Sequence, residues 1–426
     1  MTSKERTRRR AHGVTTRSVW LTLAAGIVFL PLVATTVARA SNYSVIHTFG
    51  LGKDGARPHA GLIADAAGNF YGTTEDGGAY GFGAVFAVKA NGQETVLYSF
   101  TGGSDGANPN GALVRDAAGD LYGTASGGGN LDGVCAPSGC GVVFKLQPGR
   151  ETVLYTFSGG TDGGGPWSGL IRDASGNLYG TATYGGASGA CLGGCGAVFK
   201  VDASGNETVL HNFSGAPDGE TPYAGLVMDS AGNLYGITYV GGVSGGCGGY
   251  GCGIVFELDS LGNESILYTF TGGADGGNPL YGALVLDASG DVYGTATHGG
   301  ATAGACVGFG CGVVFKVDPS GNETVLYTFT GGSDGAHPAG GVIWGGSSNL
   351  YGLAGAGGDL NGCGSLGCGV AFRLSLAGKE KVLYSFTDSS DGGQPGGGLF
   401  PYKGYLYGTT PGGGMYLSGV AFKLLP

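Results

Sequence analysis

The sequence predicts an all-β fold, a seven-bladed β-propeller of four-stranded blades, and three observations lead to this prediction. Glycine accounts for 96 of the 426 residues, and each glycine in a helix interior costs about 1 kcal/mol relative to alanine, so short strands and turns are favoured. One phrase recurs seven times along the chain. The repeats also start and stop out of phase, with a lone strand before the first unit and an incomplete unit at the end.

Residues 1–40 have the features of a secretory signal peptide. A basic segment is followed by an apolar run over residues 19–37 and by the small-x-small site Ala38-Arg39-Ala40. The run is long enough for an uncleaved membrane anchor, and the three arginines at 8–10 leave a twin-arginine route open. We expect cleavage, because Pro31 and the Ala-x-Ala site both favour it.

The mature chain is strongly acidic. Removal of residues 1–40 leaves 14 basic and 30 acidic residues, and therefore a net charge of −16. Such a protein repels nucleic acid and anionic membranes, so we expect neither as a partner after signal cleavage. The sequence ends at Pro426 without an apolar tail. We therefore expect a secreted or periplasmic monomer rather than an anchored protein.

The repeat has a period of 51 to 58 residues, measured between the tyrosines of its Tyr-Gly pairs. A period in this range indicates a propeller or a solenoid rather than independent domains, so residues 41–426 are predicted to form one domain. The repeated tyrosines are Tyr71, Tyr122, Tyr179, Tyr235, Tyr293, Tyr351 and Tyr407.

Each unit contains four predicted strands, separated by Gly-Asn or Ser-Gly-Asn hairpin signals. Residues 111–115 are an example of the first strand and residues 177–181 of the second. Residues 141–145 are an example of the third strand and residues 151–157 of the fourth. In the fourth strand, Val153 and Tyr155 lie on one face and Leu154 on the other. Apolar side chains on both faces indicate a sheet covered on both sides, as in a propeller blade between two neighbours.

The two ends of the chain complement each other. Residues 43–49 form a lone fourth strand, and residues 420–424 form a third strand with no fourth after it. Together they would complete the seventh blade and remove the open sheet edges. A β-solenoid is the alternative, but it would need atypical capping units and would gain nothing from this offset.

The repeated phrase resembles the Gloeo/Verruco (GloVer) tandem repeat. The resemblance rests on Gly-Asn-Leu-Tyr-Gly-Thr, Gly-Val-Val-Phe-Lys and Glu-Thr-Val-Leu-Tyr-Thr-Phe, and it covers residues 43–426. The resemblance implies an exported bacterial repeat protein of the choice-of-anchor type. It implies no activity.

The loop between the second and third strands varies most in length and contains every cysteine. Cysteine pairs separated by a few residues in an exported chain predict five local disulfides. Zinc is the alternative, but it would need four ligands brought together from two loops. The pairs are Cys135/Cys140, Cys191/Cys195, Cys247/Cys252, Cys306/Cys311 and Cys363/Cys368. Variable loops on a rigid scaffold predict that this face is the functional one.

Aromatic residues that break the repeat are the candidate ligand-binding residues. After the repeat proline stand His59, Asn110, Trp167, Tyr223 and, displaced by a one-residue insertion, Tyr281. Tyr184 and His298, directly before Gly-Gly pairs, are expected to join them. Flat aromatic side chains suit the apolar faces of sugar rings, so a carbohydrate is the expected ligand, with a surface protein as the other possibility. Capping of the core is the structural alternative for these rings.

The repeated Asp-Gly aspartates could surround the channel and hold a cation. Each loop offers only one acid, however, and Asp-Gly is a common turn signal, so a structural role is favoured. No metal or cofactor is predicted. These aspartates are Asp54, Asp105, Asp162, Asp218, Asp275, Asp334 and Asp391.

A binding protein without catalytic activity is therefore the favoured function. A polysaccharide hydrolase or lyase is the runner-up, and a structural scaffold for protein interactions is a third possibility. The enzyme hypothesis depends on acids outside the repeat pattern, whose separation decides such chemistry. These acids are Glu75, Asp76, Asp132, Glu220 and Asp359.

Overall fold

The computed structural model describes residues 42–50, 52–243, 247–301, 306, 308–360 and 363–426. The predicted signal peptide, residues 1–40, lies outside the described residues. Within the described part, no helix is long and apolar enough to cross a membrane.

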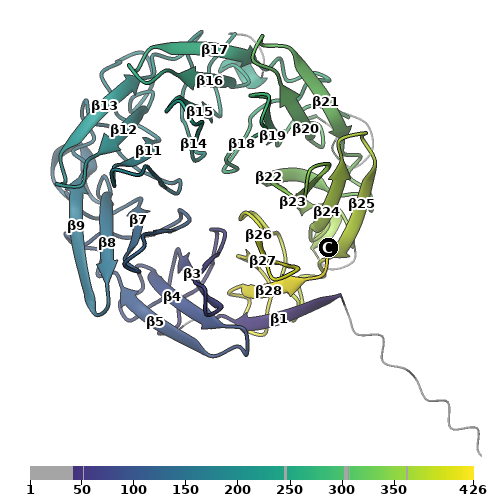
Figure 1. Cartoon of the computed structure of the whole chain (residues 1–426), viewed down its shortest axis with the longest axis horizontal. Coiled ribbons are helices and arrows are strands. Elements are labelled where there is room, and N and C mark those ends of the chain that lie inside the picture. Colours follow the sequence, from purple (N-terminus) through teal and green to yellow (C-terminus); the bar gives the residue numbers. More distant parts are fainter. Residues whose placement is uncertain (1–41, 51, 244–246, 302–305, 307, 361–362) are drawn as a thin grey trace, which may run out of the picture. The chain divides into compact units, whose positions relative to one another are not determined.

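The described chain forms seven four-stranded antiparallel sheets arranged in a ring, which confirms the predicted seven-bladed β-propeller (Figure 1). Blade 1 contains β2 (Ile63–Ala64), β3 (Asn69–Thr74), β4 (Ala84–Lys89) and β5 (Glu94–Ser99). Blade 2 contains β6 (Val114–Arg115), β7 (Leu121–Ala125), β8 (Val142–Gln147) and β9 (Arg150–Thr156). Blade 3 contains β10 (Ile171–Arg172), β11 (Leu178–Ala182), β12 (Ala197–Val201) and β13 (Glu207–Asn212).

The remaining blades follow the same order, from an inner strand to an outer strand. Blade 4 contains β14 (Val227–Met228), β15 (Leu234–Ile237), β16 (Ile254–Leu258) and β17 (Glu264–Thr269). Blade 5 contains β18 (Val285–Leu286), β19 (Val292–Ala296), β20 (Val313–Val317) and β21 (Glu323–Thr328). Blade 6 contains β22 (Ala336–Trp344), β23 (Asn349–Ala356), β24 (Val370–Ser375) and β25 (Glu380–Ser385).

The seventh sheet joins the two ends of the described chain. It contains β26 (Phe400–Tyr402), β27 (Tyr405–Thr410), β28 (Val420–Leu424) and, as its outer strand, β1 (Tyr43–Thr48). In the antiparallel pair of β1 and β28, Tyr43 lies opposite Leu424.

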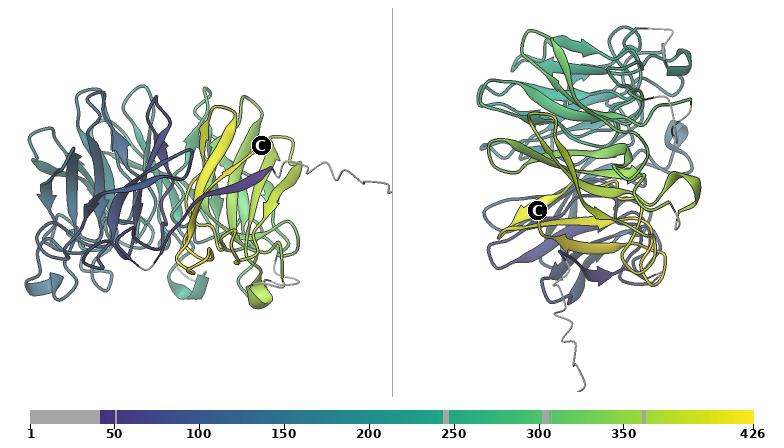
Figure 2. Two further views of the ribbon diagram at one scale, coloured as in Figure 1. Left: turned by 90° about the horizontal axis from the view of Figure 1, so that it is seen from below. Right: turned by 90° about the vertical axis from the view of Figure 1, so that its right-hand side faces the viewer.

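Short 3-10 helices lie in the loops between second and third strands. In the described chain they are η1 (Gly133–Cys135), η2 (Cys247–Gly249) and η4 (Gly364–Leu366). These loops project together from one side of the ring (Figure 2).

Pairs of phenylalanines form the core between the blades. In each pair, the phenylalanine after an outer strand meets the third-strand phenylalanine of the next blade, as Phe100 meets Phe144 edge-on at 5.1 Å. The same contact recurs at all seven junctions, in Phe49–Phe86, Phe157–Phe199, Phe213–Phe256, Phe270–Phe315, Phe329–Phe372 and Phe386–Phe422. Edge-to-face packing of this kind adds to the hydrophobic energy of burial.

The glycine of each Tyr-Gly pair makes room for this core. A Cβ atom added to Gly180 would lie 2.7 Å from Cζ of Phe199 and 2.9 Å from a methyl group of Leu170. We therefore expect Gly180→Val to destabilise the fold by about 3 kcal/mol, since overpacking a dense core is costly. Denaturant unfolding measures this loss. Gly189→Val, at a loop glycine with no neighbour within 4 Å, is the control, and equal stability of the two variants would contradict the packing argument.

Candidate functional site

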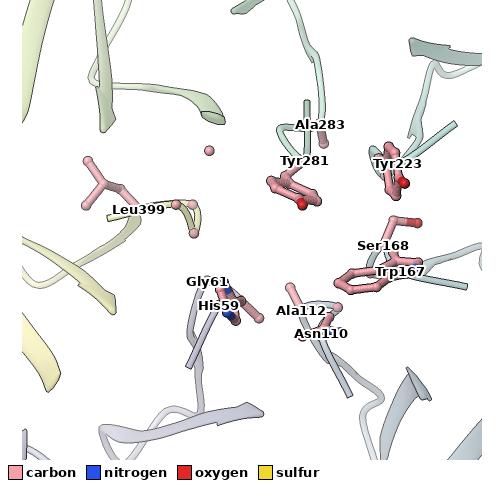
Figure 3. A pocket seen from close by; sticks show the side chains of 18 of the residues that line it. His59, Gly61, Asn110, Ala112, Trp167, Ser168, Tyr223, Tyr281, Ala283 and Leu399 are labelled. Atoms are coloured by element: carbon pink, nitrogen blue, oxygen red, sulfur yellow. The ribbon is translucent and has the colours of Figure 1, made fainter. Parts of the chain in front are cut away.

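A cavity of about 430 Å³ lies at the centre of the ring (Figure 3). Its lining residues come mainly from the segments that connect each outer strand to the next inner strand, and all seven blades contribute to it. The inner positions are small residues, among them Gly61, Ala112 and Ala283. Larger side chains near the repeat prolines therefore determine its chemical character.

Three aromatic rings form one wall of the cavity. Trp167, Tyr223 and Tyr281 come from the connections that lead into blades 3, 4 and 5. The ring centroids of Trp167 and Tyr223 are 6.1 Å apart, those of Tyr223 and Tyr281 are 5.8 Å apart, and both pairs are edge-on. Tyr281 remains 45% exposed. The three side chains lie next to one another on one side of the cavity, as Figure 3 shows.

Tyr281 has an unusual backbone conformation. Its φ angle is +55°, in the left-handed region that tyrosine rarely adopts. Tyr281 follows the one-residue insertion, and its ring lies 5.8 Å from that of Tyr223. Burial, followed by the nearby Tyr223 and Glu75, raises the pKa of Tyr281. The hydroxyl of Tyr281 is therefore protonated at neutral pH and can donate a hydrogen bond.

A fixed carboxylate stands on the blade 1 side of the cavity. Glu75 Oε2 lies 3.1 Å from His59 Nε2 and 2.9 Å from Arg57 Nη2, and the Glu75 side chain is only 14% exposed. The second guanidinium nitrogen of Arg57 lies 3.1 Å from Asp76. The hydrogen bond with His59 and the charges of His59 and Arg57 lower the pKa of Glu75 although burial opposes them, so this group is an ionised acceptor.

Asn110 adds a neutral polar group between the carboxylate and the aromatic wall. Its Nδ2 donates to the backbone carbonyl of Asn108 at 3.2 Å, while its buried Oδ1 has no hydrogen-bond partner among the described residues. Opposite the aromatic wall, the described segments of blades 6 and 7 contribute no large side chain near the repeat proline. Their lining residues there are glycines, at 340 and 396–398, followed farther along the same segments by Val342, Ile343 and Leu399. Backbone groups can therefore face a ligand on that side.

The cavity brings together four of the six candidate ligand-binding residues, His59, Trp167, Tyr223 and Tyr281. Tyr184 and His298 do not line it. The Tyr184 hydroxyl donates to the carbonyl of Gly139 at 3.2 Å and its ring covers Gly164 and Gly165, so it closes a gap between loops. The His298 ring packs against Phe309 and His337 instead. Position before the Gly-Gly pair therefore does not bring a side chain to the cavity.

Sequence reasoning missed Arg57 and Tyr239 as parts of this site and considered Glu75 only as a candidate catalytic acid. Glu75 and Tyr239 stand four residues after the repeated tyrosine, where the other units have serine, threonine, glycine or proline. The Tyr239 ring lies 5.9 Å from that of Tyr223 and supports the aromatic wall from behind. Departure from the repeat at this position was the signal that could have found Glu75 and Tyr239. The other acids considered, Asp132, Glu220 and Asp359, do not line the cavity.

The five predicted disulfides are confirmed, and all ten cysteines are paired as expected. All ten cysteines lie in the loops between second and third strands, as predicted. The second cysteine of each pair stands two residues before the third strand, so its side chain packs into the core between the blades rather than into the exposed part of the loop. These fully buried cysteines are Cys140, Cys195, Cys252, Cys311 and Cys368. Each disulfide therefore ties a loop to the blade core.

The tips of these loops, and of the shorter loops of blades 1 and 7, expose many apolar side chains. The face with the cavity mouth is therefore surrounded by rigid loops with apolar tips. The braced loops are typical of extracellular and periplasmic proteins, in which disulfides form and persist. The exposed residues are Tyr80, Phe82, Leu131, Val134, Leu192, Val243, Tyr250, Phe309, Leu360, Leu366, Met415, Tyr416 and Leu417.

The Asp-Gly aspartates hold their own turns together. The carboxylate of Asp105 accepts hydrogen bonds from the Thr101 backbone N–H and from the Tyr98 hydroxyl, both at 2.9 Å. Asp162, Asp275, Asp334 and Asp391 make the equivalent contacts. None of the seven lines the central cavity. These contacts agree with the structural interpretation of the aspartates.

The family of this chain follows from comparison with family models. The Gloeobacter/Verrucomicrobia repeat matches residues 25–189, 133–307 and 243–426. The chain belongs to this family. Comparison with curated proteins finds no match.

Solved structures resemble this Gloeobacter/Verrucomicrobia repeat protein only distantly. A proposed 6-phosphogluconolactonase from Bacteroides uniformis is 15% identical, with a TM-score of 0.48, over 83% of this chain and 89% of that one. The extracellular domain of a proposed one-component system from B. thetaiotaomicron is 12% identical, with a TM-score of 0.49, over 87% and 40% of the two chains. A proposed gluconolactonase is 14% identical, with a TM-score of 0.40, over 74% and 89%.

Proposed function

We propose that this protein is an exported binding protein that recognises a neutral carbohydrate in its central cavity, without catalysis. The observation that carries the proposal is the wall formed by Trp167, Tyr223 and Tyr281 beside a cavity of about 430 Å³. Ligand sites commonly combine apolar and aromatic walls with a few placed polar groups. A sugar ring is complementary to such a site, because it has apolar faces and a rim of hydroxyl groups.

The polar groups suit the hydroxyl groups of a sugar. Ionised Glu75 accepts hydrogen bonds, the Tyr281 hydroxyl can donate one, and Asn110 Oδ1 is a buried acceptor with no partner in the described chain. A buried polar atom left without a partner costs free energy, and a ligand hydroxyl would remove that cost.

The charges in the cavity favour a neutral ligand. Arg57 is the only lysine or arginine among the lining residues of the described chain, and both Glu75 and Asp76 already neutralise it. An anionic sugar would therefore find no free positive charge there, and it would be repelled by the acidic chain as a whole.

The enzyme alternative receives less support from the same residues. Most glycoside hydrolases need two carboxyl groups on either side of the scissile bond. Glu75 is the one carboxylic acid among the described lining residues. A lyase acting on uronic acids would need the free positive charge that Arg57 does not offer.

A glycan-array screen of the oxidised protein, residues 41–426, tests the proposal, with Trp167→Ala alongside. We expect binding of neutral glycans by the wild type and at least a tenfold weaker affinity in the variant, about 1.4 kcal/mol, because the ligand loses the contact with the indole ring. Tyr250→Ala, at a loop residue that is 72% exposed and outside the cavity, is the control.

Three results would contradict carbohydrate binding in the central cavity. A blank array would turn the search to a protein partner or a structural role. Equal losses in Trp167→Ala and Tyr250→Ala would move the site to the loop tips. Release of new products from a bound glycan would replace binding by catalysis.

A further inference from the structure

A second cluster of ligating side chains lies at the outer edge of the ring, between blades 3 and 4. His211 is in β13 of blade 3, Asp218 is in the connection between the blades, and Glu264 is the first residue of β17 in blade 4. The equivalent of His211 in the outer strands of blades 1, 2, 4, 5 and 6 is a tyrosine. The histidine is therefore a departure from the repeat and needs its own explanation.

The three side chains point at one another. His211 Nε2 lies 3.1 Å from Asp218 Oδ1 and 3.9 Å from Glu264 Oε1, and all three atoms lie within 4.8 Å of one another. The side chains are 18%, 15% and 13% exposed, respectively. Glu264 Oε1 is shielded from solvent and has no hydrogen-bond partner among the described residues.

Neighbouring groups fix two of the three side chains. The Ser214 backbone N–H and hydroxyl donate to Asp218 Oδ2 at 2.6 and 2.7 Å, which leaves Oδ1 facing His211. The His211 ring lies edge-on to Phe213 at 4.9 Å. Outer contacts of this kind orient the ligands of metal sites.

We propose that His211, Asp218 and Glu264 bind one divalent transition-metal ion, zinc being the best fit, and thereby link blades 3 and 4. One imidazole nitrogen and two carboxylate oxygens are a ligand set that zinc accepts, with bonds of about 2.0–2.2 Å and solvent in the fourth position. Calcium prefers six to eight oxygen ligands, and magnesium an octahedral oxygen shell, so neither suits this set.

The junction between blades 7 and 1 contains the same residue types in a wider arrangement. His47, Asp54 and Glu94 repeat the same residue types, but His47 Nε2 lies 3.8 Å from Asp54 Oδ2. Among the described residues, the cluster at His211 is the group in which three such donor atoms approach within 4.8 Å. We therefore expect one tight site per chain.

Calorimetric titration of the chelator-treated, oxidised protein with zinc chloride tests the proposal. The cysteines do not compete, because the described chain has no free thiol. We expect one zinc ion per chain, no comparable binding of magnesium, and a rise in Tm with zinc. Cobalt should give the visible absorption of a nitrogen- and oxygen-ligated ion.

The variants separate this cluster from the histidine of the central cavity. His211→Tyr, which restores the residue of the other blades, should lower zinc affinity at least a hundredfold, and Glu264→Gln at least tenfold, whereas His59→Asn should leave affinity unchanged. Tyr155→His, which places a histidine beside Asp162 and Glu207, should raise the stoichiometry toward two. The proposal fails if the wild type binds no zinc, or if both His211→Tyr and Glu264→Gln bind it as the wild type does.

Discussion

The free energy of unfolding is expected to fall by roughly 3 kcal/mol between pH 5 and pH 8, in contrast to the usual broad maximum near neutrality. The cause is a carboxylate pair repeated at the blade junctions. A glutamate that opens an outer strand lies beside the Asp-Gly aspartate of the preceding connection. In five of these pairs, burial, and then the negative charge of that aspartate, raises the pKa of the glutamate to about 7. The five glutamates are Glu94, Glu151, Glu207, Glu323 and Glu380.

The sign follows from the direction of these shifts. The folded-state pKa lies above the unfolded value near 4.5, so the folded protein binds more protons between these values. This stabilisation is complete below about pH 4.5 and is lost as the pH rises through 7. With a discount for partial solvent exposure, each carboxyl costs on the order of 1 kcal/mol at pH 8. Burial lowers the pKa of His47, His298 and His337, which offsets part of the loss.

Thermal unfolding in the presence of a chelator measures this effect, and a fall in Tm of about 4 °C from pH 5 to pH 8 is expected for a chain of this size. Glu151→Gln should reduce the fall, because the amide cannot ionise. Glu257→Gln, which changes a glutamate of β16 that takes no part in these junctions, should leave it unchanged. A Tm that rises steadily from pH 5 to pH 8 would contradict the argument.

Reduction of the five disulfides is expected to have the second large effect. Each bridge closes a short ring, such as that between Cys135 and Cys140, which are five residues apart. In the chain-entropy model such a ring contributes about 2 kcal/mol. The loops that contain the bridges are rich in glycine, so their unfolded segments gain much freedom on reduction. We expect a large drop in Tm in the presence of a phosphine reductant.

A variant with all ten cysteines changed to serine is the control for this experiment. Its Tm should already be low and should not respond to the reductant. Reduction of the wild type is expected to be slow below the melting range, because one sulfur of each bridge is fully buried, at Cys140, Cys195, Cys252, Cys311 and Cys368. An oxidised and a reduced wild type with equal Tm would show that the bridges do not stabilise the fold.

The repeated features of the fold could be predicted because each is local in sequence. The Tyr-Gly period gave the blade number, and the five cysteine pairs needed only the few residues between their members. The burial of one cysteine in each pair, and the Phe–Phe core contacts, could not be read in the same way. Phe100 and Phe144, for example, meet only because the outer strand of one blade lies against the next blade.

The candidate site was predictable only in part for the same reason. Trp167, Tyr223 and Tyr281 share one position in three successive units, so their proximity follows from the repeat. Arg57 and Glu75 belong to different segments of one unit, and their pairing depends on how a connection folds over a loop. The cluster of His211, Asp218 and Glu264 at the outer edge is harder still to predict, since Asp218 and Glu264 belong to neighbouring repeats.

Tryptophan fluorescence tests the central claim, carbohydrate binding at the aromatic wall, most directly. The described chain contains two tryptophans, Trp167 in the cavity and Trp344, whose Nε1 donates to the carbonyl of Leu286. In the Trp344→Phe variant, emission therefore reports on the cavity alone. We predict a saturable change in this emission when the best neutral glycan is added, and no change in Trp167→Phe. Calorimetric binding of that glycan without any change in Trp167 emission would contradict the account.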